Sequence, residues 1–173
     1  MRLFLAAVAV IAAGAAVAGS VARAAGTEQP AACAPRTPIE LPLNPWPAAA
    51  HELAPPGASA IRLCRYNGFN GPHARALASS ALVGSSRAVA ALVSELDALK
   101  PQSSRVFCPM DDGVEIDLLL GYRSGQAVHI RVEPTGCETV TNGRVTRTAA
   151  TTAAGTKLLA TIEQLTGYRA STP

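Results

Sequence analysis

The sequence predicts an α+β domain in which an antiparallel sheet of about five strands packs against two helices and carries two disulfides. Three observations support this fold class. Several short segments alternate apolar and polar residues, as strands do. Two longer segments repeat apolar residues at helical spacing. Four cysteines follow an N-terminal export signal, and an even number in an exported chain indicates disulfides.

The first 24 residues have the features of a signal peptide. Arg2 precedes an apolar run from Leu3 to Val21, and the small residues of Ala22–Ala24 form a cleavage site before Ala25. The alternative is an uncleaved anchor, because the run approaches the roughly 20 residues that span a bilayer. Its Ala and Gly content favours cleavage. Contact with a membrane is expected only if the segment stays uncleaved.

Residues 25–59 contain eight of the 13 prolines and no sustained apolar period, which predicts a linker or an extended arm. The globular α+β domain is expected to span residues 60–169. Trp46, in "NPWPA", is either a polyproline-type ligand or a cover for the edge of its own domain. The second interpretation is favoured because Cys33 must lie close to another cysteine if it is bridged.

The first half of the domain predicts two strands and a helix. The strands are Ile61–Tyr66 and Ala74–Val83. Residues 84–86 then supply an N-cap for a helix over residues 87–100, and Pro101 stops it. One face of this helix is apolar: Val89, Leu92, Val93, Leu96 and Leu99.

The second half predicts three strands and a helix. The strand-like segments are residues 105–108, 114–122 and 127–133, and "GCETVTNGRVTRT" follows them. The helix covers residues 153–167 and ends at Gly167. Its apolar side consists of Leu158, Leu159, Ile162 and Leu165.

Alternation sets the register of the hairpin between residues 114 and 133. The apolar set that includes Leu118 faces the core, so Glu115 and Asp117 face the other way. A three-residue loop at 123–125, with Gly125 left-handed, keeps the two core faces together. It places Leu120 opposite Val128, Leu119 opposite His129, Leu118 opposite Ile130 and Asp117 opposite Arg131. The resulting Glu115, Asp117 and Arg131 pairing is expected to be solvated and to contribute at most about 1 kcal/mol.

Asp111-Asp112-Gly113 predicts a turn, because Asp accepts hydrogen bonds from nearby amides and Gly tolerates a left-handed backbone. A calcium loop would need a Gly at its sixth position and a Glu at its twelfth, which are absent. A hydrolase with Asp111 and Asp112 as paired surface carboxylates is disfavoured, because adjacent turn residues are expected to diverge. No serine-hydrolase, zinc-protease or phosphate-binding motif occurs, and His129 is the only histidine on a predicted strand. No catalytic residue and no cofactor are therefore predicted.

Charge and cysteine spacing exclude two further classes. Removal of Arg2 and Arg23 with the signal segment leaves 13 basic against 12 acidic side chains, without a basic cluster, so nucleic acid is not an expected partner. The cysteines, at positions Cys33, Cys64, Cys108 and Cys137, show no zinc spacing, so no metal site is predicted. Their three possible pairings remain open at this point. The expected partner is an unidentified protein or cell-envelope ligand outside the cell.

Three motifs, "CRYNG", "CPMDDG" and "GCETVTNG", resemble the signatures of an uncharacterised domain of exported actinobacterial proteins. This resemblance covers residues 60–149 and implies export and a shared fold, without an activity. "VFCPM" is similar to the reactive-site segment of the Streptomyces subtilisin inhibitors. That resemblance implies a Cys108–Cys137 bridge, and with it a Cys33–Cys64 bridge. It also makes Met110 the specificity residue and places Asp111 after the scissile bond.

The chain departs from the inhibitor family in two respects. It lacks the additional cysteine which that family has between the positions of Cys64 and Cys108, and the turn at residues 111–113 is tight for a loop that must present extended residues. The sequence therefore favours an exported, non-catalytic binding or structural module. A subtilisin-type protease inhibitor with Met110 as specificity residue is the alternative, and a hydrolase using surface carboxylates is the third interpretation.

Overall fold

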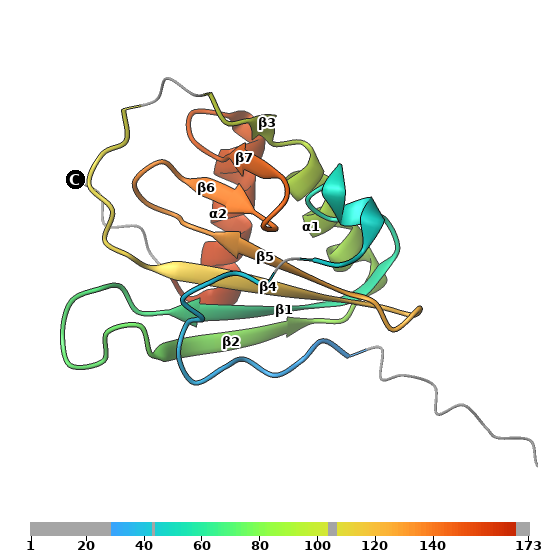
Figure 1. Ribbon diagram of the computed structural model, residues 1–173, viewed down its shortest axis with the longest axis horizontal. Coiled ribbons are helices and arrows are strands. Elements are labelled where there is room, and N and C mark those ends of the chain that lie inside the picture. Colours follow the sequence, from blue (N-terminus) through green and yellow to red (C-terminus); the bar gives the residue numbers. More distant parts are fainter. Residues whose placement is uncertain (1–28, 43, 104–106, 169–173) are drawn as a thin grey trace, which may run out of the picture.

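A computed structural model describes residues 29–42, 44–103 and 107–168 (Figure 1). The predicted signal segment, residues 1–24, lies outside the described residues. The described part is α+β, with an antiparallel sheet and two α-helices. Its elements, in chain order, are η1 (Pro47–Ala50), β1 (Ala58–Tyr66), β2 (Leu77–Val83), α1 (Ser86–Asp97), β3 (Lys100–Pro101), β4 (Glu115–Tyr122), β5 (Ala127–Val132), β6 (Thr139–Thr141), β7 (Thr146–Thr148) and α2 (Ala153–Thr166).

The sheet in the described part has seven strands in the order β2-β1-β4-β5-β6-β7-β3, so the expectation of about five was wrong. Three of the seven, β3, β6 and β7, have only two or three residues each, too few to show alternation. The strand expected at residues 105–108 is also corrected. Its described residues, Phe107 and Cys108, are not in a strand.

The register of the β4–β5 hairpin is confirmed. Asp117 pairs with Arg131, and Leu118 pairs with Ile130. The loop is three residues long, and Gly125 has the left-handed backbone (φ 78°) that this loop type requires. The alternation of β4 therefore places the apolar set that includes Leu118 on one face, and Glu115 and Asp117, together with Leu119, on the other.

Both helices cover the same face of the sheet, as Figure 1 shows. The N-cap expected near Ser85 is confirmed, since its side chain accepts a hydrogen bond from the Ala88 amide. Gly167 ends α2 in the left-handed conformation, as the sequence predicted. The core between helices and sheet contains Ile61, Leu63, Val89, Leu92, Leu96, Ile116, Leu118, Leu120, Ile130, Leu158 and Ile162. Among the described residues no helix has both the length and the hydropathy to cross a bilayer.

We define the N-terminal arm as the described residues 29–42 and 44–57, and its first part, residues 29–42, lies across the second face of the sheet (Figure 1). Its later part joins the hydrophobic core through Ala49, Leu53 and Ala54. Asp117 is 1 % exposed, and Glu115 and Arg131 are each 8 % exposed. Thr37 of the arm donates a hydrogen bond to Glu115, and Arg131 donates one to the carbonyl of Pro38. The expectation of a solvated face was therefore wrong, because the arm excludes water from it.

Two asparagine side chains hold the later part of the arm against β5 and against the turn between β6 and β7. The side chain of Asn44 accepts a hydrogen bond from the backbone N–H of His129 and donates one to its carbonyl. The amide of Asn142, which is fully buried, donates to carbonyls around η1: those of Ala49, Glu52 and Leu53. Trp46 packs edge-on against Tyr122 at 4.8 Å, so it covers its own domain, as the favoured interpretation held.

We expect Arg131→Met to destabilise the fold by about 3 kcal/mol or more, because it leaves two buried carboxylates without their common cation. Urea unfolding of the disulfide-intact protein measures this change. Arg87→Met, at an exposed position of α1, is the matched control and should stay within about 0.5 kcal/mol of wild type. A loss below about 1 kcal/mol for Arg131→Met would mean that the face is solvated after all.

Candidate functional site

The candidate site is the segment Phe107–Asp111, here called the bridged loop. Five large apolar side chains are exposed in the described part of the chain: Ile39, Phe69, Leu82, Phe107 and Met110. Phe107 is fully exposed and Met110 is 93 % exposed, and only Cys108 and Pro109 separate them. Single exposed apolar residues are ordinary, whereas two large ones on one loop indicate a contact surface.

A disulfide fixes the N-terminal side of this loop. Cys108 is bridged to Cys137, in the segment between β5 and β6, with a Cα–Cα distance of 4.7 Å. The other bridge joins Cys33 of the arm to Cys64 of β1. This is the pairing that the inhibitor resemblance implies. The first bridge therefore fixes the bridged loop, and the second fixes the arm.

A turn fixes the C-terminal side of the loop. The carboxylate of Asp111 accepts a hydrogen bond from the Gly113 amide, and that of Asp112 accepts one from the Val114 amide, both at 2.9 Å. Gly113 is left-handed (φ 74°). The turn expected from the sequence is therefore confirmed, together with its physical reason.

Thr135 connects this turn to the segment that carries Cys137. Its Oγ1 lies 2.8 Å from a carboxylate oxygen of Asp111 and 2.8 Å from one of Asp112, and it accepts a hydrogen bond from the Asp112 amide. The expectation that the two adjacent carboxylates diverge was wrong, because both meet one hydroxyl group. They already serve as acceptors for the turn, so nothing in this geometry favours the hydrolase interpretation.

A second loop, residues 67–76, supports the turn from outside. The Phe69 amide donates to the carbonyl of Asp112 at 3.1 Å. A Cβ added to Gly68 would lie 2.0 Å from that carbonyl oxygen, and one added to Gly113 would lie 2.3 Å from the Phe69 ring. The two glycines therefore permit a close approach that no other residue allows.

A cleft of about 470 Å³ lies beside the bridged loop and is lined in part by Phe107, Pro109, Cys137 and Glu138. Burial raises the pKa of the Glu138 carboxyl above its ordinary value. The cleft also borders β3, the short strand at the sheet edge. The cleft gives the bridged loop a concave neighbour on the side of Cys137.

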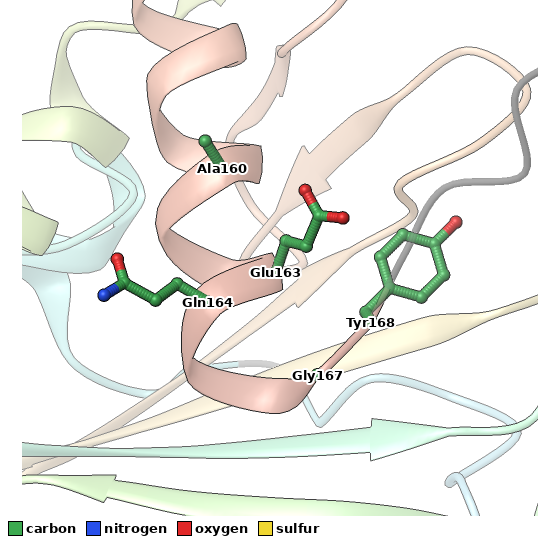
Figure 2. A pocket seen from close by; sticks show the side chains of 5 residues that line it. All are labelled: Ala160, Glu163, Gln164, Gly167 and Tyr168. Carbon is green, nitrogen blue, oxygen red and sulfur yellow. The ribbon is translucent and has the colours of Figure 1, made fainter.

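A second cavity, of about 520 Å³, lies at the C-terminal end of α2 (Figure 2). Figure 2 shows Glu163 and Tyr168 on one side of the helix and Gln164 on the other. Burial, and then the charges of Asp112 and Asp111, raise the pKa of Tyr168 to about 12. The phenol therefore stays protonated at neutral pH.

The remaining candidates for chemistry lie apart from the bridged loop. His129 Nε2 lies 3.0 Å from Asp117 Oδ2 beneath the arm, where it takes part in the buried charge network. His51 follows η1, and His73 lies in the 67–76 loop, where its carbonyl accepts a hydrogen bond from the Asn67 side chain. In the part of the chain that the structure describes, no three His, Cys, Asp or Glu side chains are grouped to hold a metal ion.

Thr135 and Phe69 were missed by the sequence reasoning, and both support the bridged loop. The signal for Phe69 was present, since an aromatic residue between glycines in "NGFNGPH" indicates a loop that approaches another backbone closely. Nothing local marks Thr135, because its partners lie 23 and 24 residues earlier in the chain. Neither family models, curated proteins nor solved structures match this chain.

We expect Thr135→Val to loosen the turn, because it removes the hydroxyl that meets both carboxylates and the Asp112 amide. Loss of such hydrogen bonding costs about 1 kcal/mol, so amide hydrogen exchange at Asp112 and Gly113 should accelerate roughly fivefold. Thr135→Ser keeps the hydroxyl and is the control. Equal exchange rates in the Val and Ser variants would show that Thr135 does not hold the turn.

Proposed function

We propose that this protein is an exported, non-catalytic binding module whose contact element is the bridged loop. The observation that carries this proposal is the full exposure of Phe107 and Met110 on a segment fastened at both ends. Apolar side chains held in this way lose water only when a partner covers them. A partner with an apolar concave surface is the chemistry that matches them.

The fastening supports binding rather than a purely structural role. A loop that is already ordered loses little conformational entropy when it associates, which raises affinity without additional contacts. The bridge and the turn order this loop, although none of its residues belongs to the hydrophobic core. Its flanking residues are tied to a single segment, Thr135–Cys137.

Export is the second part of the proposal. All four cysteines are paired in two disulfides, which suits an oxidising compartment. Together with the predicted signal peptide, this supports release outside the cell. An oxidising environment would also keep Cys137 and Cys108 joined, so the contact element would persist where the partner is met.

The double variant Phe107→Ser/Met110→Ser tests the binding role. The wild-type protein, immobilised, should recover a specific protein from the culture fluid or envelope extract of its host. Affinity for that isolated protein should fall at least about 30-fold in the double variant, as for loss of a buried anchor. Ile39→Ser, which removes a side chain 87 % exposed on the arm, should bind as wild type. Equal affinity of the double variant would exclude the bridged loop as the contact element.

A second candidate function is inhibition of a subtilisin-type serine protease, with Met110 as the specificity residue. The arrangement around the Met110–Asp111 bond favours it. On one side Cys108 is bridged to Cys137, and on the other Asp111 meets Thr135. If a protease cut this bond, both new ends would stay attached to the same short segment. The cleaved loop would then keep its shape, and the protease could reform the bond. The loop would therefore stay bound in the active site and inhibit the protease.

Met110→Lys tests this second function by exchanging the side chain that would enter the specificity pocket. A pocket shaped for an apolar residue should reject lysine, so the inhibition constant for subtilisin should rise at least about 100-fold while trypsin inhibition appears. Met110→Leu is the conservative control and should still inhibit subtilisin. Absence of inhibition by the wild-type protein at micromolar concentration, against any serine protease, would rule out this function.

A further inference from the structure

The turn after Met110 limits how far the bridged loop can follow a protease cleft. Asp111 is exposed, but Asp112 is half-buried and Gly113 is buried. The carbonyl of Asp112 is already bonded to the Phe69 amide, and the carboxylates of Asp111 and Asp112 are bonded to backbone amides. The main chain beyond Asp111 is therefore occupied within the protein. It presents no apolar side chain to the part of a cleft that receives the residues following a scissile bond.

Phe69 presents an exposed apolar ring beside this turn. Its ring packs on Gly113, three residues after Met110, and 54 % of the residue remains exposed. The guanidinium of Arg75 lies 5.8 Å from the ring centroid and pairs with Glu115 at 3.5 Å. The ring is thus held from two sides while it faces solvent. Rigid aromatic side chains of this kind are frequent anchors of protein interfaces.

We propose that Phe69 is the second anchor of the surface that binds a subtilisin-type protease. It contacts the wall of the cleft on the leaving-group side of Met110–Asp111, in place of the extended residues that the turn removes. The matching wall is apolar opposite the ring and carries no positive charge beside Arg75. This inference rests on the second candidate function.

A photo-cross-linking experiment tests contact directly. The full chain carries p-benzoylphenylalanine in place of Phe69 and is irradiated with subtilisin. A covalent product should form, and it should disappear when a peptidyl chloromethyl ketone occupies the active site of the protease. The same probe in place of Ile39, on the arm, is the control and should give no product.

Inhibition constants for subtilisin show whether the contact is an anchor. Phe69→Ser should raise the inhibition constant at least about tenfold, as for loss of an interface aromatic residue. Phe69→Tyr keeps the ring and should stay within about threefold of wild type. Cleavage of the Met110–Asp111 bond, followed by mass spectrometry, should be no faster in Phe69→Ser than in wild type, because the variant keeps the backbone amide that bonds the Asp112 carbonyl.

The outcomes separate this inference from the function on which it rests. If the wild-type protein does not inhibit subtilisin, the second candidate function fails and the inference fails with it. If it inhibits, support requires both the active-site-dependent cross-link and the rise in the inhibition constant. The absence of either overturns the anchor role alone. Faster cleavage of Phe69→Ser, without a cross-link, would show that Phe69 only supports the turn.

Discussion

The ion pairs that Arg131 makes with Glu115 and Asp117 are the constraint on which the rest of the structure depends. Three charged side chains taken out of water would destabilise the fold if any one of them lost its partners. Arg131 Nε lies 3.0 Å from the first carboxylate and 3.1 Å from the second. Thr37 and Pro38 of the arm supply further polar contacts, in addition to those of Arg75 and His129. The proline-rich arm is therefore part of the domain's packing.

One disulfide stabilises this buried face, and the other stabilises the exposed bridged loop. Each closes a loop of about 30 residues, which contributes roughly 3.5 kcal/mol through restriction of the unfolded chain. The Cys33–Cys64 bridge holds the arm against the sheet where the charges lie. The Cys108–Cys137 bridge fixes one side of the solvent-exposed bridged loop. Thr135 and Phe69 fix the other side through their hydrogen bonds to the turn. A rigid sheet thus carries a rigid loop with exposed apolar side chains, which is the arrangement that the proposed binding function needs.

The sequence predicted the register of β4 and β5 because a period of two with one apolar face allows one alignment, and Gly125 fits only one loop. It also predicted the turn at Asp111-Asp112-Gly113, whose hydrogen bonds are local. It did not predict β3, β6 and β7, because two or three residues are too few for a pattern. The exposure of Glu115 was misjudged for a different reason. Nothing between residues 114 and 133 says what covers the second face of the sheet.

By itself, the sequence determined what depends on neighbours along the chain: the strand faces, the helix ends at Ser85 and Gly167, and the turn before β4. Tertiary structure alone decided what depends on distant segments. The arm reaches β5 across about 90 residues to Arg131, and Thr135 reaches Asp111 across 24. Local hydrogen bonds and periodicity follow from backbone geometry, whereas such long-range contacts form only when folding brings the segments together.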